Sequence, residues 1–322
     1  MRLITPFLTF LWLILPLQVL GQVFLRAADV HPSQYPTAQS VIYMGKRIAE
    51  MSNNDLVMKH YAAAQLGQEK DTILATIFGA IDINRINVAP LGNIAQELQV
   101  LSLPYLFRDQ DHMYSVLEGE IGEQLLDYLT PHHLVGLAFL DSGARSFYTK
   151  KPINKLSDMK GLKIRVQNTD MFVRMMDALG ANATPMSFGQ VYESLLTGVI
   201  DGAENNWPSY VSTRHFEAAK YYTLDRHSMV PEVIVMSEES WNKLSKEHQF
   251  IVKKAAKEAS KHMRVIWNER VNKAKAQAIQ AGIIINENIE LDEFVRAVEP
   301  LYQDVMQDPE LADLITKIRE AR

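Results

Sequence analysis

The sequence has 322 residues, of which 47% are hydrophobic and 22% are charged, an ordinary composition for a globular chain of about two domains. Its formal net charge of −5 argues against general binding to nucleic acid or to an anionic membrane, so an anionic ligand would need Arg or Lys placed at one site. The absence of cysteine excludes disulfides, thiol catalysis and cysteine-based metal sites.

The first 21 residues have the pattern of a secretory signal peptide. Arg2 precedes an apolar run over 3–20, and the small residue Gly21 follows it. The run is also about long enough for a transmembrane anchor, but its two prolines favour cleavage. No second apolar run of this length follows in the sequence. We therefore expect residues 1–21 to be removed on export and the remaining chain not to be embedded in a membrane.

Apolar runs of strand length then alternate with amphipathic stretches of helix length, which predicts an α/β fold with mainly parallel strands. The first strands are expected at 23–30, 56–61, 83–90 and 133–140. The first helices are expected at 37–51, 69–78 and 112–129. A second series begins near Gly143, with strands at 146–149, 162–166, 199–206 and 230–237 and helices at 169–179 and 189–196.

The C-terminal third is predicted to contain one very long helix. The segment from Lys246 to Ala281 has neither proline nor glycine, Ser245 is a favourable N-cap, and Gly282 ends the pattern. At about 1.5 Å per residue such a helix is ~50 Å long, enough to bridge two lobes. Two shorter helices are expected to follow it, at 291–307 and 310–322.

The two α/β series are not separated by a flexible linker. This organisation predicts two lobes joined by crossing strands, with a cleft between them where small ligands commonly bind. The predicted first lobe comprises 22–141 plus 230–270. The predicted second lobe comprises 142–229 plus 271–322, including the C-terminal helices.

The sequence carries no common catalytic motif. It lacks glycine-rich nucleotide fingerprints, the H-E-x-x-H pattern and the G-x-S-x-G nucleophile elbow. The adjacent His132 and His133 are interpreted as turn residues rather than metal ligands. An enzyme acting on an organic acid would need a positioned general base, such as Glu69 or His31, but no nucleophile or metal pairs with either. We therefore expect a binding protein without enzymatic activity, cofactor or metal.

Two arginines fall beside or inside predicted buried strands. Arg145 follows the strand at 133–140, and Arg165 lies within the strand at 162–166. A buried guanidinium is unfavourable unless it is paired, and its planar fork suits a carboxylate. The two side chains could hold one ligand carboxylate between them. Alternatively, either arginine could form a salt bridge with an Asp or Glu of the protein itself.

Three segments resemble the DctP-type substrate-binding proteins of TRAP transporters, which are tripartite, ATP-independent systems for organic acids. The segments are HYAAAQLGQEKD at 60–71, GLKIRVQ at 161–167 and ATPMSFGQVYESLLTGVIDGAENN at 183–206. The resemblance extends from about Leu25 to the C-terminus. It implies a two-lobed periplasmic-binding-protein fold with hinge strands and a long helix bridging the lobes.

The resemblance also implies a location and partners. The chain is expected in the periplasm of a Gram-negative bacterium, as a monomer that captures a small carboxylate-bearing ligand and delivers it to TRAP membrane subunits. No nucleic-acid partner is implied. Presentation of the ligand-bound form to a signalling receptor is an alternative that the sequence does not separate from transport.

The family pattern assigns roles to residues of the second lobe. Arg165, in the G-L-K-x-R motif, is expected to form the main ion pair with the ligand carboxylate. Arg145 is expected to assist on the carboxylate or on a neighbouring oxygen. Asn205, in the D-G-x-E-N motif, is expected to donate or accept a hydrogen bond that selects the orientation of the carboxylate.

Contacts are also expected from an aromatic residue and from the first lobe. Phe188, in the P-M-x-F segment, is expected to pack on the ligand. Gln68 and Glu69 follow the Q-L-G motif, where family members place polar contacts from the other lobe. Closure of the lobes would exclude water, which strengthens an Arg–carboxylate pair because the local dielectric falls.

The kind of acid is predicted from residues around the expected cleft. His31 follows the first strand, and Trp207 and Tyr210 follow Asn205, so aromatic and neutral polar groups suit a polyhydroxylated acid. The H-P-x-x-Y-P-T and D-G-A-E-N-N-W segments resemble members that bind hexuronates such as glucuronate and galacturonate. His31 could instead be a turn or capping residue, and Trp207 and Tyr210 could pack at the hinge.

A C4-dicarboxylate is the alternative ligand within the same family. Its second carboxylate would need another cationic anchor. Lys70 and Arg85 are candidates for that anchor, although no motif supports either.

Overall fold

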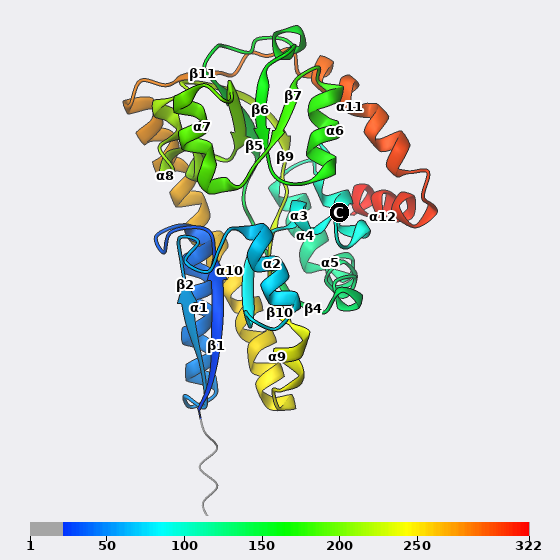
Figure 1. Ribbon diagram of the computed structural model, residues 1–322. Coiled ribbons are helices and arrows are strands. Elements are labelled where there is room, and N and C mark those ends of the chain that lie inside the picture. Colours follow the sequence, from blue (N-terminus) through cyan, green and yellow to red (C-terminus); the bar gives the residue numbers. More distant parts are fainter. Residues whose placement is uncertain (1–21, 322) are drawn as a thin grey trace, which may run out of the picture.

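The computed structural model describes residues 22–321 and consists of two lobes, each built around one β-sheet (Figure 1). The lower lobe in this view contains the blue N-terminal strands, and the upper lobe contains the green middle part of the chain. The predicted signal peptide at 1–21 lies outside the described residues. In the part of the chain that is described, no helix has the length and apolar character needed to cross a membrane.

The first lobe contains a five-stranded sheet in the order β2-β1-β3-β10-β4. Its strands are β1 (Val23–Asp29), β2 (Leu56–Tyr61), β3 (Ile83–Asn87), β4 (Leu134–Leu140) and β10 (Glu232–Ser237). Strand β1 runs parallel to β2 and β3, whereas β10 runs antiparallel to its neighbours β3 and β4. Every residue of β3 and β10 is buried, as expected for interior strands that are covered on both faces.

The second lobe contains a six-stranded sheet in the order β11-β9-β5-β8-β6-β7. Its strands are β5 (Arg145–Thr149), β6 (Lys163–Val166), β7 (Asn182–Pro185), β8 (Gly202–Asn205), β9 (Tyr221–Ser228) and β11 (Ile284–Asn286). Strand β6 runs parallel to β7 and β8, and β11 runs parallel to β9. Strand β5 runs antiparallel to its neighbours β8 and β9.

Both sheets contain mainly parallel strands, as predicted, but each also contains one reversed strand. In each sheet one strand, β5 or β10, is antiparallel to both of its neighbours. Both strands follow a crossing between the lobes, from β4 to β5 and from β9 to β10. A strand that enters from the other lobe starts at the sheet edge facing that lobe. It therefore runs opposite to strands whose carboxyl ends meet at the same edge.

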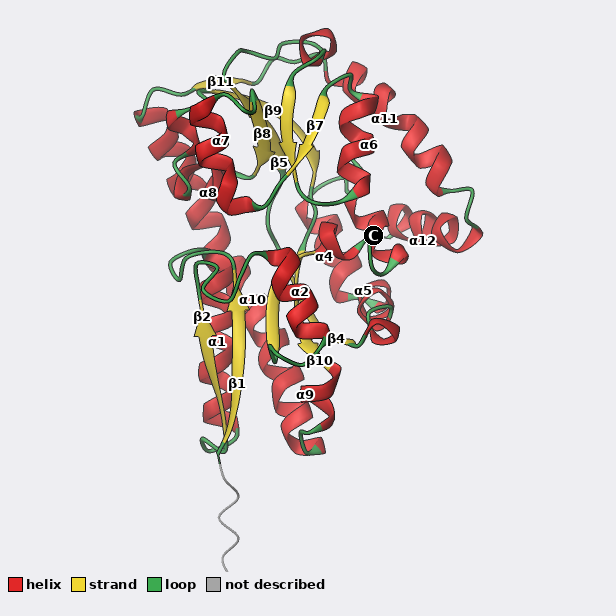
Figure 2. Cartoon of the chain, viewed as in Figure 1, coloured by secondary structure: helices red, strands yellow, loops and turns green. Residues whose placement is uncertain are grey.

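Helices cover the faces of both sheets (Figure 2). Those that follow or precede first-sheet strands are α1 (Pro36–Met51), α2 (Glu69–Ile77), α3 (Val88–Leu91), α4 (Gln110–Glu118), α5 (Glu120–Asp127) and α9 (Glu238–Asn242). Those that follow second-sheet strands are α6 (Asp170–Ala178), α7 (Val191–Thr197) and α8 (Trp207–Ser212). The predicted α/β class, with two lobes joined by crossing strands, is confirmed by this arrangement.

The helix expected over 112–129 is two helices, α4 and α5, which meet at Gly119. The backbone of Gly119 is extended, with φ −89° and ψ −169°, so helical hydrogen bonding stops there. Gly122 then permits a close approach, because a Cβ at this position would lie 2.0 Å from the carbonyl oxygen of Leu117. The apolar spacing of the segment does not reveal this break.

The long helix expected over 246–281 is α10 (Lys246–Gln280), which runs behind both lobes (Figure 1). The side chain of Ser245 accepts a hydrogen bond from the backbone N–H of His248 and caps the helix start. The first part of the helix, up to Trp267, packs in a core with α1 and β4. Ala274 and Ala278 belong to a different core, beside α8. One helix therefore connects the two hydrophobic cores.

Two connections between the lobes lie together against α10. Ser142, between β4 and β5, donates a hydrogen bond of 2.6 Å to the carbonyl of Val230, between β9 and β10. Gly143 has a φ of +64°, and a Cβ there would lie 3.0 Å from the ring of Trp267. The hinge thus needs glycine both for its backbone conformation and for its close contact with the long helix.

The C-terminal helices are divided between the lobes. Helix α11 (Leu291–Val305) packs against α6, whereas α12 (Pro309–Glu320) packs against α5. The placement of α12 differs from the predicted boundary, which assigned all of 271–322 to the second lobe. After α11 the chain returns to the first lobe. There the twelve residues of α12 pack against α5.

Candidate ligand-binding site

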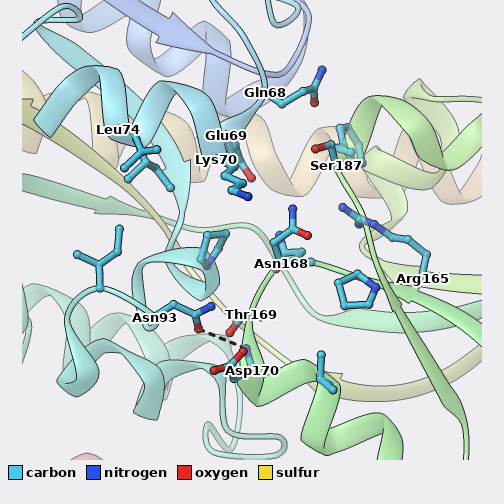
Figure 3. Close-up of a pocket in the computed structure, with 17 residues that line it drawn as sticks. Gln68, Glu69, Lys70, Leu74, Asn93, Arg165, Asn168, Thr169, Asp170 and Ser187 are labelled. Atoms are coloured by element: carbon cyan, nitrogen blue, oxygen red, sulfur yellow. Dashed lines mark hydrogen bonds between the residues drawn. The ribbon is translucent and has the colours of Figure 1, made fainter. Parts of the chain in front are cut away.

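A cavity of about 410 Å³ lies between the lobes, next to the carboxyl ends of β6 and β7 and the segment that follows β3. The start of α2 and the segment after α3 line it from the first lobe, and the segments after β6 and β7 line it from the second (Figure 3). Polar first-lobe residues in the lining are Gln68, Glu69, Lys70 and Asn93. Second-lobe residues include Arg165, Gln167, Asn168, Asp170 and Phe188.

Arg165 supplies a buried cation to this cavity. It lies on β6, between β7 and β8, and its exposed fraction is 3%. Its Nε and Nη2 donate hydrogen bonds to the carbonyl of Met186, at 3.1 and 2.8 Å. Among residues 22–321 no carboxylate lies within salt-bridge distance of it. Burial lowers the pKa of Arg165 and outweighs the opposing charge of Glu204, which lies outside salt-bridge distance.

Arg145 is neutralised within the protein. Its Nε and Nη2 donate to the two carboxylate oxygens of Glu204 at 2.5 and 2.8 Å, and its Nη1 donates to Oδ1 of Asn205 at 3.2 Å. Burial would raise the pKa of Glu204, but Arg145 outweighs it, and the pKa falls to about 2. The alternative of an internal salt bridge therefore describes Arg145, and Asn205 is one of its partners.

A buried histidine extends the Arg145–Glu204 pair. Nε2 of His227 lies 3.4 Å from the carboxylate of Glu204, and its Nδ1 lies 2.6 Å from the carboxylate of Asp225. Burial alone would lower the pKa of His227, but Asp225 and Glu204 raise it to about 9. The second lobe thus contains an ionic network with two cations and two anions beneath the cavity.

The first lobe contains a different network, which we call the Arg85 cluster: Asp29, Glu69, Arg85 and Glu232. The guanidinium of Arg85 is fully buried and contacts all three carboxylates. Its Nη1 lies 2.8 Å from Glu232 and 3.3 Å from Glu69, and it also donates to Asp29. Arg85, a candidate second anchor from the sequence, is therefore already occupied by the protein's own anions.

Aromatic side chains lie beside the cavity. His31 stacks on Tyr35 at 3.7 Å between ring centroids, and the edge of Phe188 approaches His31 at 5.1 Å. The guanidinium carbon of Arg165 lies 5.9 Å from the centroid of Phe188. Phe188 thus bridges the first-lobe histidine and the second-lobe arginine.

Sequence reasoning missed two buried residues near Arg165. The hydroxyl of Tyr148 and Nδ1 of His215 are 2.8 Å apart, and the ring of His215 lies 6.0 Å from Phe188. Burial, followed by the charge of Arg165, lowers the pKa of His215 to about 3. Tyr148 and His215 are 67 residues apart, so no local motif could have indicated the pair.

Two of the predicted aromatic residues lie elsewhere, in the core around α8. Trp207 stacks on Tyr222 at 3.7 Å, and the hydroxyl of Tyr210 donates to the carbonyl of Ala219 at 2.6 Å. Neither is among the described residues that line the cavity. Their contacts agree with the alternative of packing near the hinge.

Hydrogen bonds connect the lobes across the cavity. Oε1 of Gln68 accepts from the N–H of Gly189 at 3.3 Å, and Oδ1 of Asn93 accepts from the N–H of Asp170 at 3.2 Å (Figure 3). Deeper in the molecule, the hydroxyl of Tyr35 lies 2.9 Å from that of Ser209. The lobes are therefore in direct contact on both sides of the site.

The site combines one buried cation without an ion-pair partner in the described chain, Arg165, with several neutral hydrogen-bonding groups. Nδ1 of His31 and Oε1 of Gln167 are buried and have no hydrogen-bond partner within the described chain. Buried polar atoms are normally paired, so Gln167, which lines the cavity, and His31, which lies beside it against Phe188, are both suited to bind a ligand. The arrangement can hold one carboxylate at Arg165 and hydroxyl groups at the surrounding polar atoms.

A scan of protein families gives a match over most of the chain. Residues 27–308 match the family model named DctP, described as bacterial extracellular solute-binding protein, family 7. This range contains both sheets except the first residues of β1, and all the residues that line the cavity.

Solved structures of similar proteins agree with the fold. A TRAP periplasmic solute-binding protein of Bradyrhizobium sp. BTAi1, with bound α/β-D-galacturonate, is 49% identical, with 92% of this chain and 99% of that chain covered and a TM-score of 0.91. One of Xanthobacter autotrophicus Py2, with bound β-D-galacturonate, is 46% identical, with 92% and 100% covered and a TM-score of 0.91. One of Chromohalobacter salexigens, with bound D-glucuronate, is 41% identical, with 92% and 100% covered and a TM-score of 0.90.

Proposed function

The chain belongs to the DctP family of bacterial extracellular solute-binding proteins, and from this premise we propose that it binds a hexuronate, glucuronate or galacturonate. The observation that carries the proposal is the buried guanidinium of Arg165, which has no carboxylate partner in the described chain. The three solved relatives support the choice of ligand, because each holds one of these two sugar acids at 41%, 46% or 49% identity.

In the proposed complex the carboxylate of the sugar acid pairs with Arg165. Phe188 packs on the sugar ring, while Gln68 and Glu69 bind hydroxyl groups from the first lobe. The buried Nδ1 of His31 takes a further hydroxyl. A monocarboxylate with several hydroxyl groups fits this set, since hydroxyls need hydrogen-bond partners once they are buried.

The remaining predicted residues act indirectly in this proposal. Arg145 and Asn205 hold each other and Glu204 beneath the cavity, and so maintain the sheet that carries Arg165. Trp207 and Tyr210 belong to α8 and pack in the core around it. None of these four needs to touch the sugar for the site to work.

We further propose that the protein acts in the periplasm, where it delivers its ligand to TRAP membrane subunits. The lobes of this proposal are 22–141 plus 230–270 and 142–229 plus 271–308, with α12 resting on the first lobe. Ligand binding shifts the population of molecules toward closed lobes, which gives the membrane partner a distinct shape to bind. The family is one of binding proteins, and the proposal assigns no catalytic step.

A thermal-shift screen of ligand-stripped protein tests the ligand class. The panel contains glucuronate, galacturonate, their methyl esters, C4-dicarboxylates, a sialate and amino acids. A ligand at about 100 times its Kd stabilises the fold by ~2.7 kcal/mol, so the hexuronates should raise the melting temperature by several degrees. The esters should not. Equal shifts for acid and ester would contradict the carboxylate anchor, and a shift with C4-dicarboxylates alone would replace the proposed ligand.

A further inference from the structure

The first-lobe wall of the cavity carries an excess of negative charge. In the Arg85 cluster, one guanidinium is surrounded by three carboxylates. The other titratable groups within salt-bridge distance of these described carboxylates are His31, 3.7 Å from Glu232, and His60, 3.5 Å from Asp29. Even with both imidazoles protonated, positive and negative groups would only be equal in number. With its three carboxylates ionised, the cluster therefore offers no net positive charge to a ligand.

Glu69 is the member of the cluster that reaches the cavity. Its side chain is 16% exposed and lines the cavity, whereas the side chains of Asp29 and Glu232 are 0% and 4% exposed. Oε1 of Glu69 is fixed by Nη1 of Arg85 at 3.3 Å and by the N–H of Asn87 at 3.1 Å. Its Oε2 has no hydrogen-bond donor within residues 22–321, which leaves a charged acceptor for a ligand.

The buried charge of the opposite wall is positive, because Arg165 is buried whereas the carboxylate in that wall, Asp170, is exposed. Arg165 on β6 is the second-lobe cation that lines the cavity, and Glu69 at the start of α2 faces it from the first lobe (Figure 3). A ligand whose carboxylate pairs with Arg165 therefore extends toward Glu69. A hydroxyl at that end can donate to Oε2, whereas a second carboxylate cannot donate and is repelled.

We infer that Glu69, fixed by Arg85, is a charge filter that admits hydroxylated monocarboxylates and rejects dicarboxylates, including sugar diacids. The inference rests on the proposed function, because it requires the ligand carboxylate to pair with Arg165. Like charges ~5 Å apart at an effective dielectric constant of ~20 change an equilibrium by a factor on the order of 100. The filter therefore separates two ligands that differ only in one terminal carboxylate.

Lys70 is the one feature of the wall that could oppose the filter. It is exposed and lines the cavity next to Glu69, so a second carboxylate has a cation within reach. An exposed Lys–carboxylate contact contributes little in water, whereas Glu69 is largely removed from solvent. The filter thus predicts that Lys70 does not rescue the binding of a diacid.

Isothermal titration of the ligand-free protein with galacturonate and with the six-carbon diacid galactarate tests the filter. Wild type should bind galactarate at least about 100-fold more weakly than galacturonate. Glu69→Gln should move the two affinities in opposite directions: galactarate should bind at least about 10-fold more tightly, and galacturonate about 5-fold more weakly, because a charged acceptor becomes neutral. Asp71→Asn is the matched control, since it removes the same charge from an exposed site on the same helix and should leave both affinities unchanged.

Two results would overturn the filter. One is a failure of Glu69→Gln to gain affinity for galactarate. The other is wild-type binding of galactarate within about 10-fold of galacturonate, with Lys70→Met abolishing it, which would make Lys70 a second anchor. In both cases the proposed function survives if wild type binds a hexuronate. If wild type binds neither glucuronate nor galacturonate, the proposed function itself fails.

Discussion

Arg145 and Arg165 lie in the same sheet and are almost equally buried, at 2% and 3% exposure, but their charges are balanced differently. Arg145 forms a two-pronged ion pair with Glu204, whereas within residues 22–321 the hydrogen bonds of Arg165 go to the carbonyl of Met186. The first arrangement is complete inside the protein. The second leaves a buried cation whose partner a ligand carboxylate can supply.

The difference shows that burial and position at a strand end do not identify a ligand anchor. A paired buried cation stabilises the fold only as long as its partner remains, because removing one member leaves the other charge buried and uncompensated. An unpaired buried cation is unfavourable in the free protein and favourable in the complex. We therefore expect Arg145 to act mainly on stability and Arg165 mainly on binding.

The largest expected effect is the loss of binding in Arg165→Met. This substitution removes the charge but retains most of the side-chain volume, so the ligand carboxylate would be buried without a cation. We expect hexuronate affinity to fall at least ~1,000-fold, or about 4 kcal/mol, with little change in the melting temperature of the ligand-free protein. Calorimetric titration and a thermal melt measure the two quantities.

Arg174→Met is the control for this experiment. Arg174 lies on α6 of the same lobe and forms an ion pair with Asp304 at 2.8 Å, with its side chain 37% exposed. Affinity and melting temperature should both stay close to wild type, since exposed ion pairs contribute little. Near-native hexuronate affinity in Arg165→Met would show that Arg165 does not bind the ligand carboxylate.

Arg145→Met should give the reverse pattern. The carboxylate of Glu204 would remain buried with only His227 nearby, and we expect the free energy of unfolding to drop by about 3 kcal/mol. The double variant Arg145→Met with Glu204→Met should recover much of this loss, because neither charge is then left alone. Denaturant unfolding of the three proteins measures the effect. An unchanged single variant that has lost ligand binding would show that Arg145 contacts the ligand after all.

The sequence predicts that Arg145 and Arg165 are buried, but it does not predict which of them has an ion-pair partner within the protein. The GLKIRVQ segment places Arg165 on a buried strand, and the apolar run at 133–140 places Arg145 just after another. The pairing of Arg145 depends on Glu204, which is 59 residues away and reaches it only because β5 and β8 are neighbours. The local sequence pattern indicates that an arginine is buried, whereas its ion-pair partner depends on the order of the strands in the sheet.

The same limit applies to the fold. The helix at 246–281 was predictable, because a proline- and glycine-free segment with a good N-cap fixes its own conformation. The direction of β5 and β10 was not, since apolar runs look alike in parallel and antiparallel strands. The Arg85 cluster could not be predicted from the sequence either, because Arg85 is 56 residues from Asp29 and 147 from Glu232.

The ionic network around Arg145 should also limit stability at both ends of the pH range. Glu204 has its pKa lowered to about 2, so its contribution is present above its unfolded pKa of 4.5 and is lost as the pH falls through 2. His227 has its pKa raised to about 9, so its contribution is present below 6.5 and is lost as the pH rises through 9. Both contributions are complete between pH 4.5 and 6.5, so the network predicts a plateau of stability over that range.

Urea unfolding at a series of pH values tests this expectation. Between pH 6.5 and 9 the free energy of unfolding should fall by roughly 2 kcal/mol in wild type. His227→Gln should lower stability at pH 6 and remove the alkaline fall, since no proton is then lost from this site. Arg165→Met should keep most of the wild-type profile, because among the described residues no salt bridge or hydrogen bond joins Arg165 to the network. A flat profile in wild type would argue against a charged His227 in the folded protein.

The smallest expected effect concerns a contact between the lobes rather than a buried charge. Gln68→Ala removes the acceptor for the N–H of Gly189, an exposed hydrogen bond, together with the proposed contact of Gln68 with a ligand hydroxyl. We expect the Kd of the hexuronate to rise about 5-fold, mainly through faster dissociation, because such bonds contribute ~0.5–1.5 kcal/mol. Gln65→Ala, an exposed substitution in the same first-lobe loop, should have no effect.

Gly189→Ala makes this last prediction specific to the contact. A Cβ at residue 189 would lie 2.9 Å from Nε2 of Gln68, so the alanine should displace the Gln68 side chain and weaken binding in the wild-type background. In the Gln68→Ala background there is nothing left to displace, and Gly189→Ala should then have little effect. Stopped-flow dissociation rates of the four proteins form a double-mutant cycle. Additive effects would mean that the two residues act separately.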